Sequence, residues 1–156
     1  MNVQSAARVC EDERLCSNGA RERKTLTPAQ KRGLKYQAKV EKELLQLFPG
    51  RVIPRPWFRY KQDWVVKRCE PDLLLETDSG ICVVEVKYST IPEAWGKLNK
   101  VYGPVVKQAY RVPVALALIT RRFDPAVRFD CCVTQLEGLE ALLKWRGEGL
   151  GVVSWR

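Results

Sequence analysis

The chain has 156 residues, of which 46% are hydrophobic and 29% charged, and its formal net charge is +9. This length and composition fit one globular domain with its own core and exclude a disordered polymer. No apolar run approaches the roughly 18 residues of a membrane-spanning helix, and the first 16 residues lack the apolar stretch of a secretory signal. We therefore expect a soluble, cytoplasmic protein that does not contact a membrane.

The residue types present restrict the chemistry. Histidine is absent, which excludes Ser-His-Asp hydrolysis, histidine-based zinc sites and nucleases that use an imidazole base. The six cysteines match no metal-ligand spacing, so we expect reduced, mostly packed thiols. The role of Cys10 and Cys16, in a polar segment, stays open. Acid–base chemistry must fall to carboxylates, lysine, tyrosine or metal-bound water.

The N-terminal third is predicted to contain an arm and a helix. Residues 1–24 alternate in charge and lack apolar periodicity, so we expect a flexible charged arm, followed by a single domain over residues 25–156. Thr27 can cap a helix that has Pro28 in its first turn. Apolar residues then recur at helical spacing until Pro49 and Gly50. This pattern predicts a helix over residues 28–48.

Residues 51–69 combine β-branched and aromatic residues with cations. Pro54 and Pro56 confine strand pairing to an edge or to the segment after Trp57. Residues 25–70 carry eleven basic and four acidic side chains, so +7 of the +9 lies there. Cations interleaved with rings suit a phosphate backbone and exposed bases, although a basic solvated face with its aromatics in the core is the alternative. The candidate nucleic-acid contacts here are Arg55, Trp57, Arg59, Lys61, Lys67 and Arg68.

The segment from residue 71 to 87 is predicted to be a β-hairpin. Residues 77–80, Thr-Asp-Ser-Gly, form a turn signal between two apolar strands. With the loop centred between Asp78 and Ser79, Asp72 lies opposite Glu85. Side chains alternate along a strand, so Glu85 and Lys87 share a face with Asp72. We call Asp72, Glu85 and Lys87 the charged cluster.

The C-terminal half is predicted to alternate helices and strands. A second helix begins at Pro92 and ends near residue 110. The apolar run 112–120 suits a central parallel strand reached by a βαβ crossover. Residues 122–130 are a connection that can hold an edge strand, residues 133–147 a third helix, and residues 152–155 a short closing strand.

Two facing carboxylates repel each other, so the charged cluster needs compensation. Lys87 could supply it alone, which would make the cluster a structural ion-pair network. A divalent cation would do it better, because Mg²⁺ takes oxygen ligands and needs only one or two carboxylates. Such a metal keeps positions open for a substrate phosphate and an attacking water.

The motif Pro71-Asp72, a spacer of twelve, then Glu85-Val86-Lys87, within helix, hairpin, helix and apolar strand, resembles the PD-(D/E)XK nuclease core. The resemblance covers roughly residues 30–120 and is closest to small stand-alone bacterial and phage members. It implies an α/β fold with a three-layer α/β/α restriction-endonuclease-like core, whose mixed sheet holds an antiparallel hairpin and a parallel crossover strand. It also implies a magnesium-dependent deoxyribonuclease, acting on DNA in a bacterial or phage-infected cell. Many such nucleases dimerise, so a homodimer is left open.

The resemblance assigns roles by position. Asp72, Glu85 and the Val86 carbonyl would bind Mg²⁺ or Mn²⁺, and Lys87 would orient water or stabilise phosphoryl charge. Family members often carry a glutamate on the first helix, where this chain has Gln37; Glu41, one turn further on, could substitute. On the second helix Tyr102 fits the family pattern, whereas Lys97 stands in place of a glutamine. Lys97, Lys100 and Tyr102 are further candidate nucleic-acid contacts.

Two other functions remain open at this stage. A nuclease-like fold without chemistry could hold DNA or RNA through its basic face, although such a binder has no need of an acidic pocket. Its binding would fall steeply with salt and ignore divalent metal. A structural or partner-binding protein would show neither nucleic-acid affinity nor metal dependence.

Overall fold

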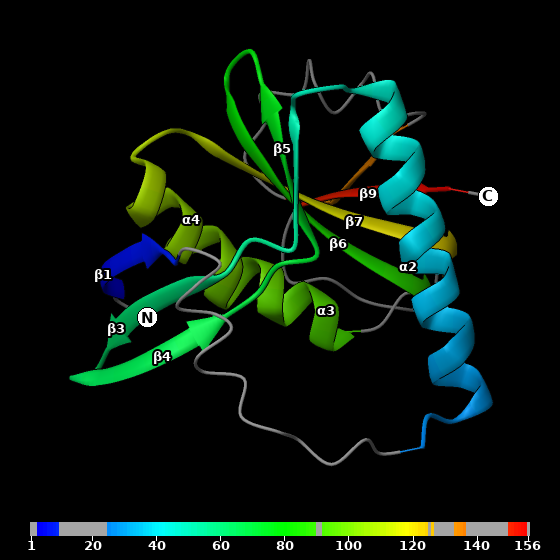
Figure 1. Cartoon of the computed structure of the whole chain (residues 1–156), viewed down its shortest axis with the longest axis horizontal. Coiled ribbons are helices and arrows are strands. Elements are labelled where there is room, and N and C mark those ends of the chain that lie inside the picture. The colour runs from blue at the N-terminus through cyan, green and yellow to red at the C-terminus, as the bar shows by residue number, and fades with distance from the viewer. Residues whose placement is uncertain are drawn as a thin grey trace.

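The computed structural model describes residues 3–9, 25–89, 92–124, 126, 133–136 and 150–155. It shows a mixed α/β protein with two sheets (Figure 1). The smaller sheet is antiparallel, in the order β1 (Val3–Arg8), β3 (Phe58–Gln62), β4 (Val65–Cys69). The larger sheet is mixed, in the order β2 (Val52–Pro54), β5 (Leu73–Thr77), β6 (Gly80–Ser89), β7 (Val114–Arg122), β9 (Leu150–Ser154), β8 (Val133–Leu136).

The first predicted helix is confirmed as α2 (Pro28–Leu47). Thr27 caps it, because its side chain accepts from the Gln30 amide while the Gln30 side chain accepts from the Thr27 amide. Tyr36, Val40 and Leu44, spaced by four residues, are its buried positions. This spacing places one stripe of the helix against the sheet.

The hairpin and its register are also confirmed. Leu73 pairs with Val84 and Thr77 with Gly80, so Asp78 and Ser79 form the two-residue turn. Extending this register by one residue places Asp72 opposite Glu85, as predicted. β2 pairs with the outer side of β5, where Pro54 is tolerated because it lies at the sheet edge.

A helical crossover connects β6 to β7. It consists of α3 (Pro92–Lys97), a π-helical turn η1 (Leu98–Tyr102) and α4 (Gly103–Tyr110). Pro104 has no amide proton for the α-helical ladder, and the preceding amide of Gly103 bonds to Leu98, five residues back. β7 then runs parallel to β6, which confirms the predicted central strand.

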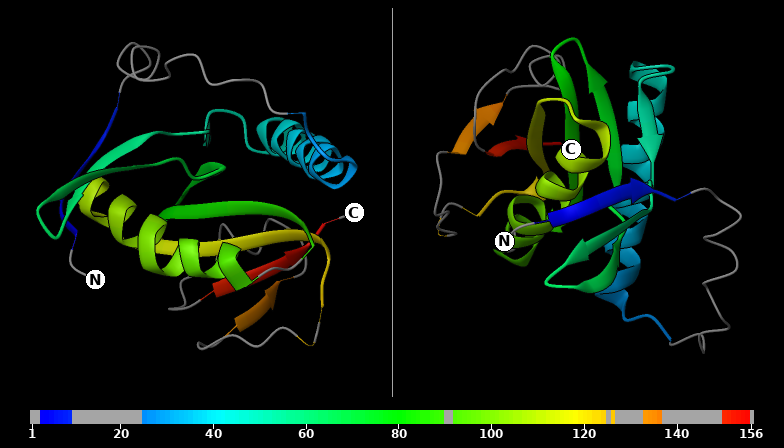
Figure 2. Two further views of the ribbon diagram at one scale, coloured as in Figure 1. Left: turned by 90° about the horizontal axis from the view of Figure 1, so that it is seen from below. Right: turned by 90° about the vertical axis from the view of Figure 1, so that its left-hand side faces the viewer.

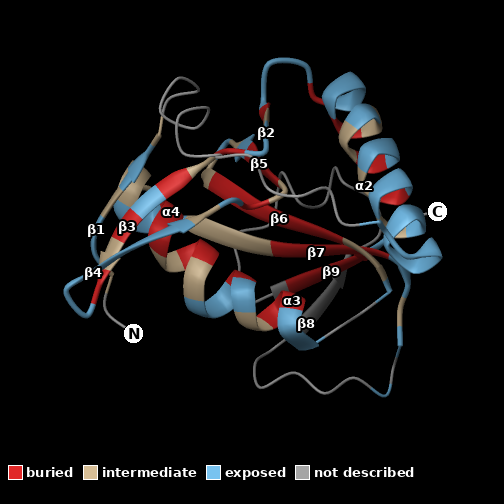
Figure 3. Ribbon diagram, turned by 60° about the horizontal axis from the view of Figure 1, so that its bottom comes forward, coloured by how far each residue is buried: buried red, intermediate tan, exposed pale blue. Residues whose placement is uncertain are grey.

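The two helical segments cover opposite faces of the larger sheet (Figures 1 and 2). On one face, α2 packs on Leu73, Leu75, Cys82, Val84 and Val86. On the other face, α3 to α4 packs on Leu74, Ile81, Val83 and Leu118, together with Phe58 and Tyr60 from β3. Figure 3 shows β6 buried along most of its length and β7 buried in its middle part, from Ala117 to Thr120. Residues of even number on β6 therefore face α2, and residues of odd number face α3.

Two predicted elements are corrected. Residues 3–8 of the expected flexible arm form β1, because the open edge of β3 pairs with them; residues 10–24, with Cys10 and Cys16, lie outside the described residues. Residues 133–136, expected to begin a third helix, form β8 on the open edge of β9. The prediction gave more weight to the helical spacing of the later residues than to the strand preference of the β-branched Val133 and Thr134. Residues 137–149, the rest of the predicted helix, are not described.

Several smaller expectations are settled by the same residues. The closing strand is present as β9. Cys69 and Cys82 are free thiols, and burial raises the pKa of each to about 12. The edge strand allowed within residues 122–130 falls mainly on residues that are not described. No helix in the described part of the chain is long and apolar enough to cross a membrane.

Candidate active site

The charged cluster lies at the edge of the larger sheet, just before the start of β5 and beside the second half of β6. Asp72 precedes β5, and its carbonyl accepts a hydrogen bond of 2.8 Å from the Arg55 amide, which follows β2. β6 continues to Ser89, beyond the point where β5 can pair with it. The end of β6 therefore has a free edge at which side chains from several elements can meet.

Asp72 is held by two short hydrogen bonds from different elements. Its Oδ1 accepts a hydrogen bond of 2.7 Å from the side-chain amide of Gln37 on α2, and its Oδ2 accepts one of 2.7 Å from the backbone N–H of Val86. Lys87 Nζ lies 3.7 Å from the same Oδ2. Each carboxylate oxygen can accept about two hydrogen bonds, so Oδ1 keeps acceptor capacity. Asp72 thus joins α2 to β6 without being saturated.

Glu85 is 2% exposed and only half satisfied. Its Oε1 lies 2.6 Å from Lys87 Nζ, whereas its Oε2 is buried and has no hydrogen-bond partner within the residues that the structure describes. Burial, and secondly the Asp72 charge, raise the pKa of Glu85, and Lys87 acts in the opposite direction. A buried carboxylate oxygen without a partner carries the full desolvation penalty.

Lys87 remains an ammonium in this surrounding. Burial lowers its pKa, but the charges of Asp72 and Glu85 act more strongly together, and the net direction is upward. The amine is therefore protonated at neutral pH. It can stabilise negative charge or donate a proton, and is poorly suited to act as a base.

Two further oxygen atoms, the Val86 carbonyl and the Thr120 hydroxyl, belong to the surroundings of the charged cluster. In the hairpin register, Val86 stands opposite Pro71, which has no N–H that could reach the Val86 carbonyl. Thr120 stands beside Lys87 on β7, and its Oγ1 is buried without a partner among the described residues. Sequence reasoning missed Thr120, because only the parallel register of β6 and β7 brings it to the cluster.

Of the other predicted site residues, Tyr102 and Lys97 lie near the charged cluster, whereas Glu41 contacts Arg55. Tyr102 is buried, and burial followed by the Glu85 charge raises its pKa, so it lies close to the cluster. The charge of Lys97 lowers the Glu85 pKa, which places it within electrostatic reach, and Lys100 is exposed on the next turn. Glu41 instead lies 3.7 Å from the Arg55 guanidinium. Gln37, not Glu41, is thus the α2 residue that contacts Asp72.

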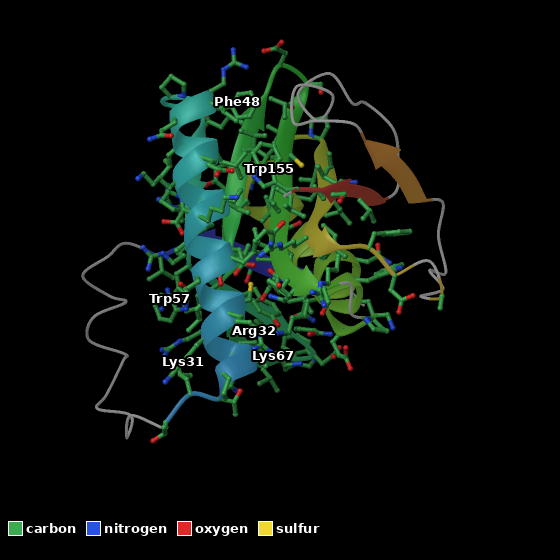
Figure 4. The ribbon with its side chains drawn as sticks, turned by 90° about the vertical axis from the view of Figure 1, so that its right-hand side faces the viewer. Lys31, Arg32, Phe48, Trp57, Lys67 and Trp155 are labelled. Carbon is green, nitrogen blue, oxygen red and sulfur yellow. The ribbon has the colours of Figure 1, made fainter. Side chains whose placement is uncertain are left out.

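The predicted nucleic-acid segment is a second hairpin, formed by β3 and β4, which we call the basic hairpin. Cations lie on rings in two places: Arg68 is 5.1 Å from the Trp57 ring and Lys61 is 4.7 Å from the Trp64 ring. Lys67 donates to Gln62 at 3.1 Å, and Arg59 is exposed. Figure 4 labels Trp57 and Lys67 in this region.

The rings of the basic hairpin have different environments. Phe58 and Tyr60 are core residues, at 0% and 7% exposure, so the alternative interpretation holds for them. Trp64, at the tip, is 79% exposed and has a φ of 66°. A bulky residue held exposed in left-handed backbone is unusual. Sequence reasoning included Trp64 in the aromatic content of the segment but did not single it out.

Both ends of the basic hairpin lead into the charged cluster. Arg55, whose amide bonds to the Asp72 carbonyl, lies two residues before Trp57. At the other end, β4 finishes at Cys69, and Glu70 and Pro71 connect it directly to Asp72. The exposed cations and Trp64 therefore stand on a hairpin that is joined directly to the cluster at both of its ends.

In the described part of the chain, no three acidic, cysteine or histidine side chains converge as a metal-binding group; Asp72 and Glu85 are a pair. Comparisons with protein-family models, with curated protein sequences and with solved structures gave no match for this chain.

Proposed function

We propose that this protein is a metal-dependent nuclease that hydrolyses DNA phosphodiester bonds, with a three-layer α/β/α core of the restriction-endonuclease type and a role in bacterial or phage DNA processing. The observation that carries the proposal is the buried Oε2 of Glu85, which lies beside a second carboxylate and has no hydrogen-bond partner among the described residues. A structural ion-pair network would be expected to satisfy both oxygens, because the unpaired one is costly.

The residues present suit a hard divalent cation. Asp72, Glu85 and the Val86 carbonyl would hold Mg²⁺ or Mn²⁺, because these metals take oxygen ligands and retain several waters. Within the described residues Glu85 Oε2 has no hydrogen-bond partner, Pro71 opposite Val86 has no N–H to offer the Val86 carbonyl, and Asp72 Oδ1 has acceptor capacity left. When bound, the metal would act as a Lewis acid and make water more acidic.

The protein's own residues have separate tasks in this proposal. Gln37 and the Val86 N–H fix the Asp72 carboxylate, and their bonds to it come from two different elements. Lys87, kept protonated by its two acidic neighbours, stabilises charge that develops on the phosphoryl oxygens. The basic hairpin contacts the DNA backbone with its cations, and Trp64 offers a ring for base stacking.

Incubation with circular plasmid and with labelled single-stranded DNA, in Mg²⁺, Mn²⁺ or EDTA, tests the proposal. The wild-type protein is expected to cut in metal only, and Asp72→Asn, which keeps the side-chain shape, to bind DNA without cutting. Nicked circles would indicate an endonuclease and shortened strands an exonuclease. Salt-sensitive binding without cutting in any metal would instead identify a nucleic-acid-binding module. Equal cutting by Asp72→Asn would remove the cluster from the mechanism.

A further inference from the structure

A pocket of about 260 Å³ lies between α2 and the ends of β6 and β7, apart from the charged cluster. We call it the cationic pocket; its lining residues are Arg32, Lys35, Tyr36, Lys39, Tyr88 and Arg121. This volume is large enough for several water molecules. Arg32 is labelled on α2 in Figure 4. Nothing in the proposed chemistry uses this pocket.

The pocket has a well-packed aromatic side. The rings of Tyr36 and Tyr88 meet edge to face, with 5.9 Å between their centroids. The Tyr36 hydroxyl donates to the Trp155 carbonyl at 2.7 Å, which ties α2 to the residue after β9. The Arg121 guanidinium lies 5.5 Å from the Tyr88 ring centroid. The two tyrosines thus form the aromatic side of the pocket, and the exposed cations lie around it.

The cations on α2 are arranged against helix stability. Arg32, Lys35 and Lys39 follow one another at intervals of three and four residues, where like charges repel. The first turn of α2 has no acidic residue, although the helix dipole favours negative charge there. Lys39 has a partner in Glu43 at 3.7 Å. Within the described residues, Arg32, Lys35 and Arg121 form no ion pair, so no described carboxylate neutralises these three cations by direct contact.

The cationic pocket and the charged cluster lie at the same end of β6. Tyr36 is the neighbour of Gln37, and Tyr88 is the neighbour of Lys87, with adjacent Cα atoms about 3.8 Å apart. Because side chains alternate along a strand, Tyr88 faces α2 while Lys87 faces the opposite side. A nucleic-acid strand that reaches the charged cluster around the free edge of β6 therefore passes close to the cationic pocket.

We propose that the cationic pocket holds a phosphate group of the nucleic-acid strand, as an anchor separate from the place of cleavage. The inference rests on the proposed function, because it assigns the phosphate to the same substrate. Arginine and lysine together match a phosphate in shape and charge, and a phosphate would compensate the repulsion on α2. Helix faces that sacrifice stability in this way are typical of functional surfaces.

The test is binding of a labelled oligonucleotide in EDTA, where cutting cannot interfere. Arg121→Gln and Lys35→Glu are each expected to weaken binding about tenfold or more, the size of one charged hydrogen bond. The slope of log affinity against log salt should fall by about 0.7 to 0.9 for each phosphate that a variant no longer neutralises. Lys42→Gln, an exposed lysine on α2 outside the pocket, is the matched control and should bind nearly as the wild type does.

Thermal unfolding separates a binding role from a structural one. Lys35→Glu replaces three repulsive pairs, with Lys31, Arg32 and Lys39, by attractive ones, so its Tm should rise at low salt and return towards the wild-type value at high salt. A higher Tm together with weaker binding supports the proposal. A lower Tm with unchanged binding overturns it.

The two proposals fail in different ways. If the wild type cuts DNA and the pocket variants bind and cut normally, the pocket inference is wrong and the nuclease stands. If no DNA is cut but the pocket variants bind more weakly, the anchor stands without the nuclease. Oligonucleotides with a 5′-phosphate, a 3′-phosphate or neither identify the phosphate: equal weakening on all three indicates an internal one, and weakening confined to one indicates that terminus.

Discussion

The charged cluster and the basic hairpin adjoin each other, but they use their charges differently. In the cluster, Glu85 is 2% exposed, and one of its oxygens has no partner in the part of the chain that the structure describes. In the basic hairpin, the cations are exposed or partly exposed and lie on rings or on an amide. A buried, unsatisfied charge has an energetic cost that a ligand can remove, whereas an exposed cation has almost none. The proposed cleavage therefore rests on the charged cluster, and the basic hairpin supports only the proposed affinity for DNA.

The largest expected effect separates these two roles by one substitution in each region. Lys87→Met should reduce cleavage about 10³-fold or more, roughly 4 kcal/mol of transition-state stabilisation, with little change in DNA affinity. Lys67→Met in the basic hairpin should weaken binding and leave cleavage at saturating DNA near the wild-type rate. Single-turnover cleavage and anisotropy binding measure both. If Lys67→Met also abolished cleavage at saturation, the division between chemistry and affinity would be wrong.

Mg²⁺ should raise the free energy of unfolding through the charged cluster, and substitutions in the basic hairpin should not change this gain. Because a ligand that binds only the folded state stabilises it by mass action, Mg²⁺ at a hundred times its Kd should add about 2.7 kcal/mol to the free energy of unfolding. Asp72→Asn should lose most of this gain, while Trp64→Ala should keep it. Chemical denaturation with and without Mg²⁺ gives the difference. Equal stabilisation of Asp72→Asn would mean that the metal binds elsewhere.

The tip of the basic hairpin should matter for single strands. Removing the exposed ring by Trp64→Ala should weaken single-stranded DNA binding by about 1–3 kcal/mol, the usual range for base stacking. Trp64→Phe, which keeps a stacking surface, should retain most of the affinity. Stability should hardly change, because Trp64 is 79% exposed. If both variants bind as the wild type does, Trp64 serves another surface.

The smallest effect concerns Gln37, the α2 residue whose side-chain amide donates to Asp72. Gln37→Ala removes one hydrogen bond to Asp72 and should lower metal-dependent cleavage about fivefold, equivalent to roughly 1 kcal/mol. Gln37→Glu places a third carboxylate beside Asp72 and Glu85. Its Tm should therefore be lower than that of the wild type without metal, and the difference should disappear when Mg²⁺ is added. Wild-type behaviour of both variants would reduce Gln37 to a surface residue.

The sequence by itself determined the local elements near the site. The cap at Thr27, the apolar residues that recur at helical spacing after it, and the two-residue turn after Thr77 are short-range patterns, and the helix and the hairpin that they specify were predicted at the correct positions. The register of a tight hairpin follows from its turn, so the facing of Asp72 and Glu85 was accessible as well. These features depend on residues close to one another along the chain.

Only the tertiary structure decided what reaches the site from elsewhere. Gln37 rather than Glu41 contacts Asp72 because of the position of α2, and Thr120 arrives through the parallel register of β7. β1 and β8 form on the open edges of β3 and β9, which no local pattern reveals. The cationic pocket likewise needs α2, β6 and β7 together. Propensity and periodicity act within a segment, whereas edges, burial and unsatisfied atoms arise only when distant segments pack.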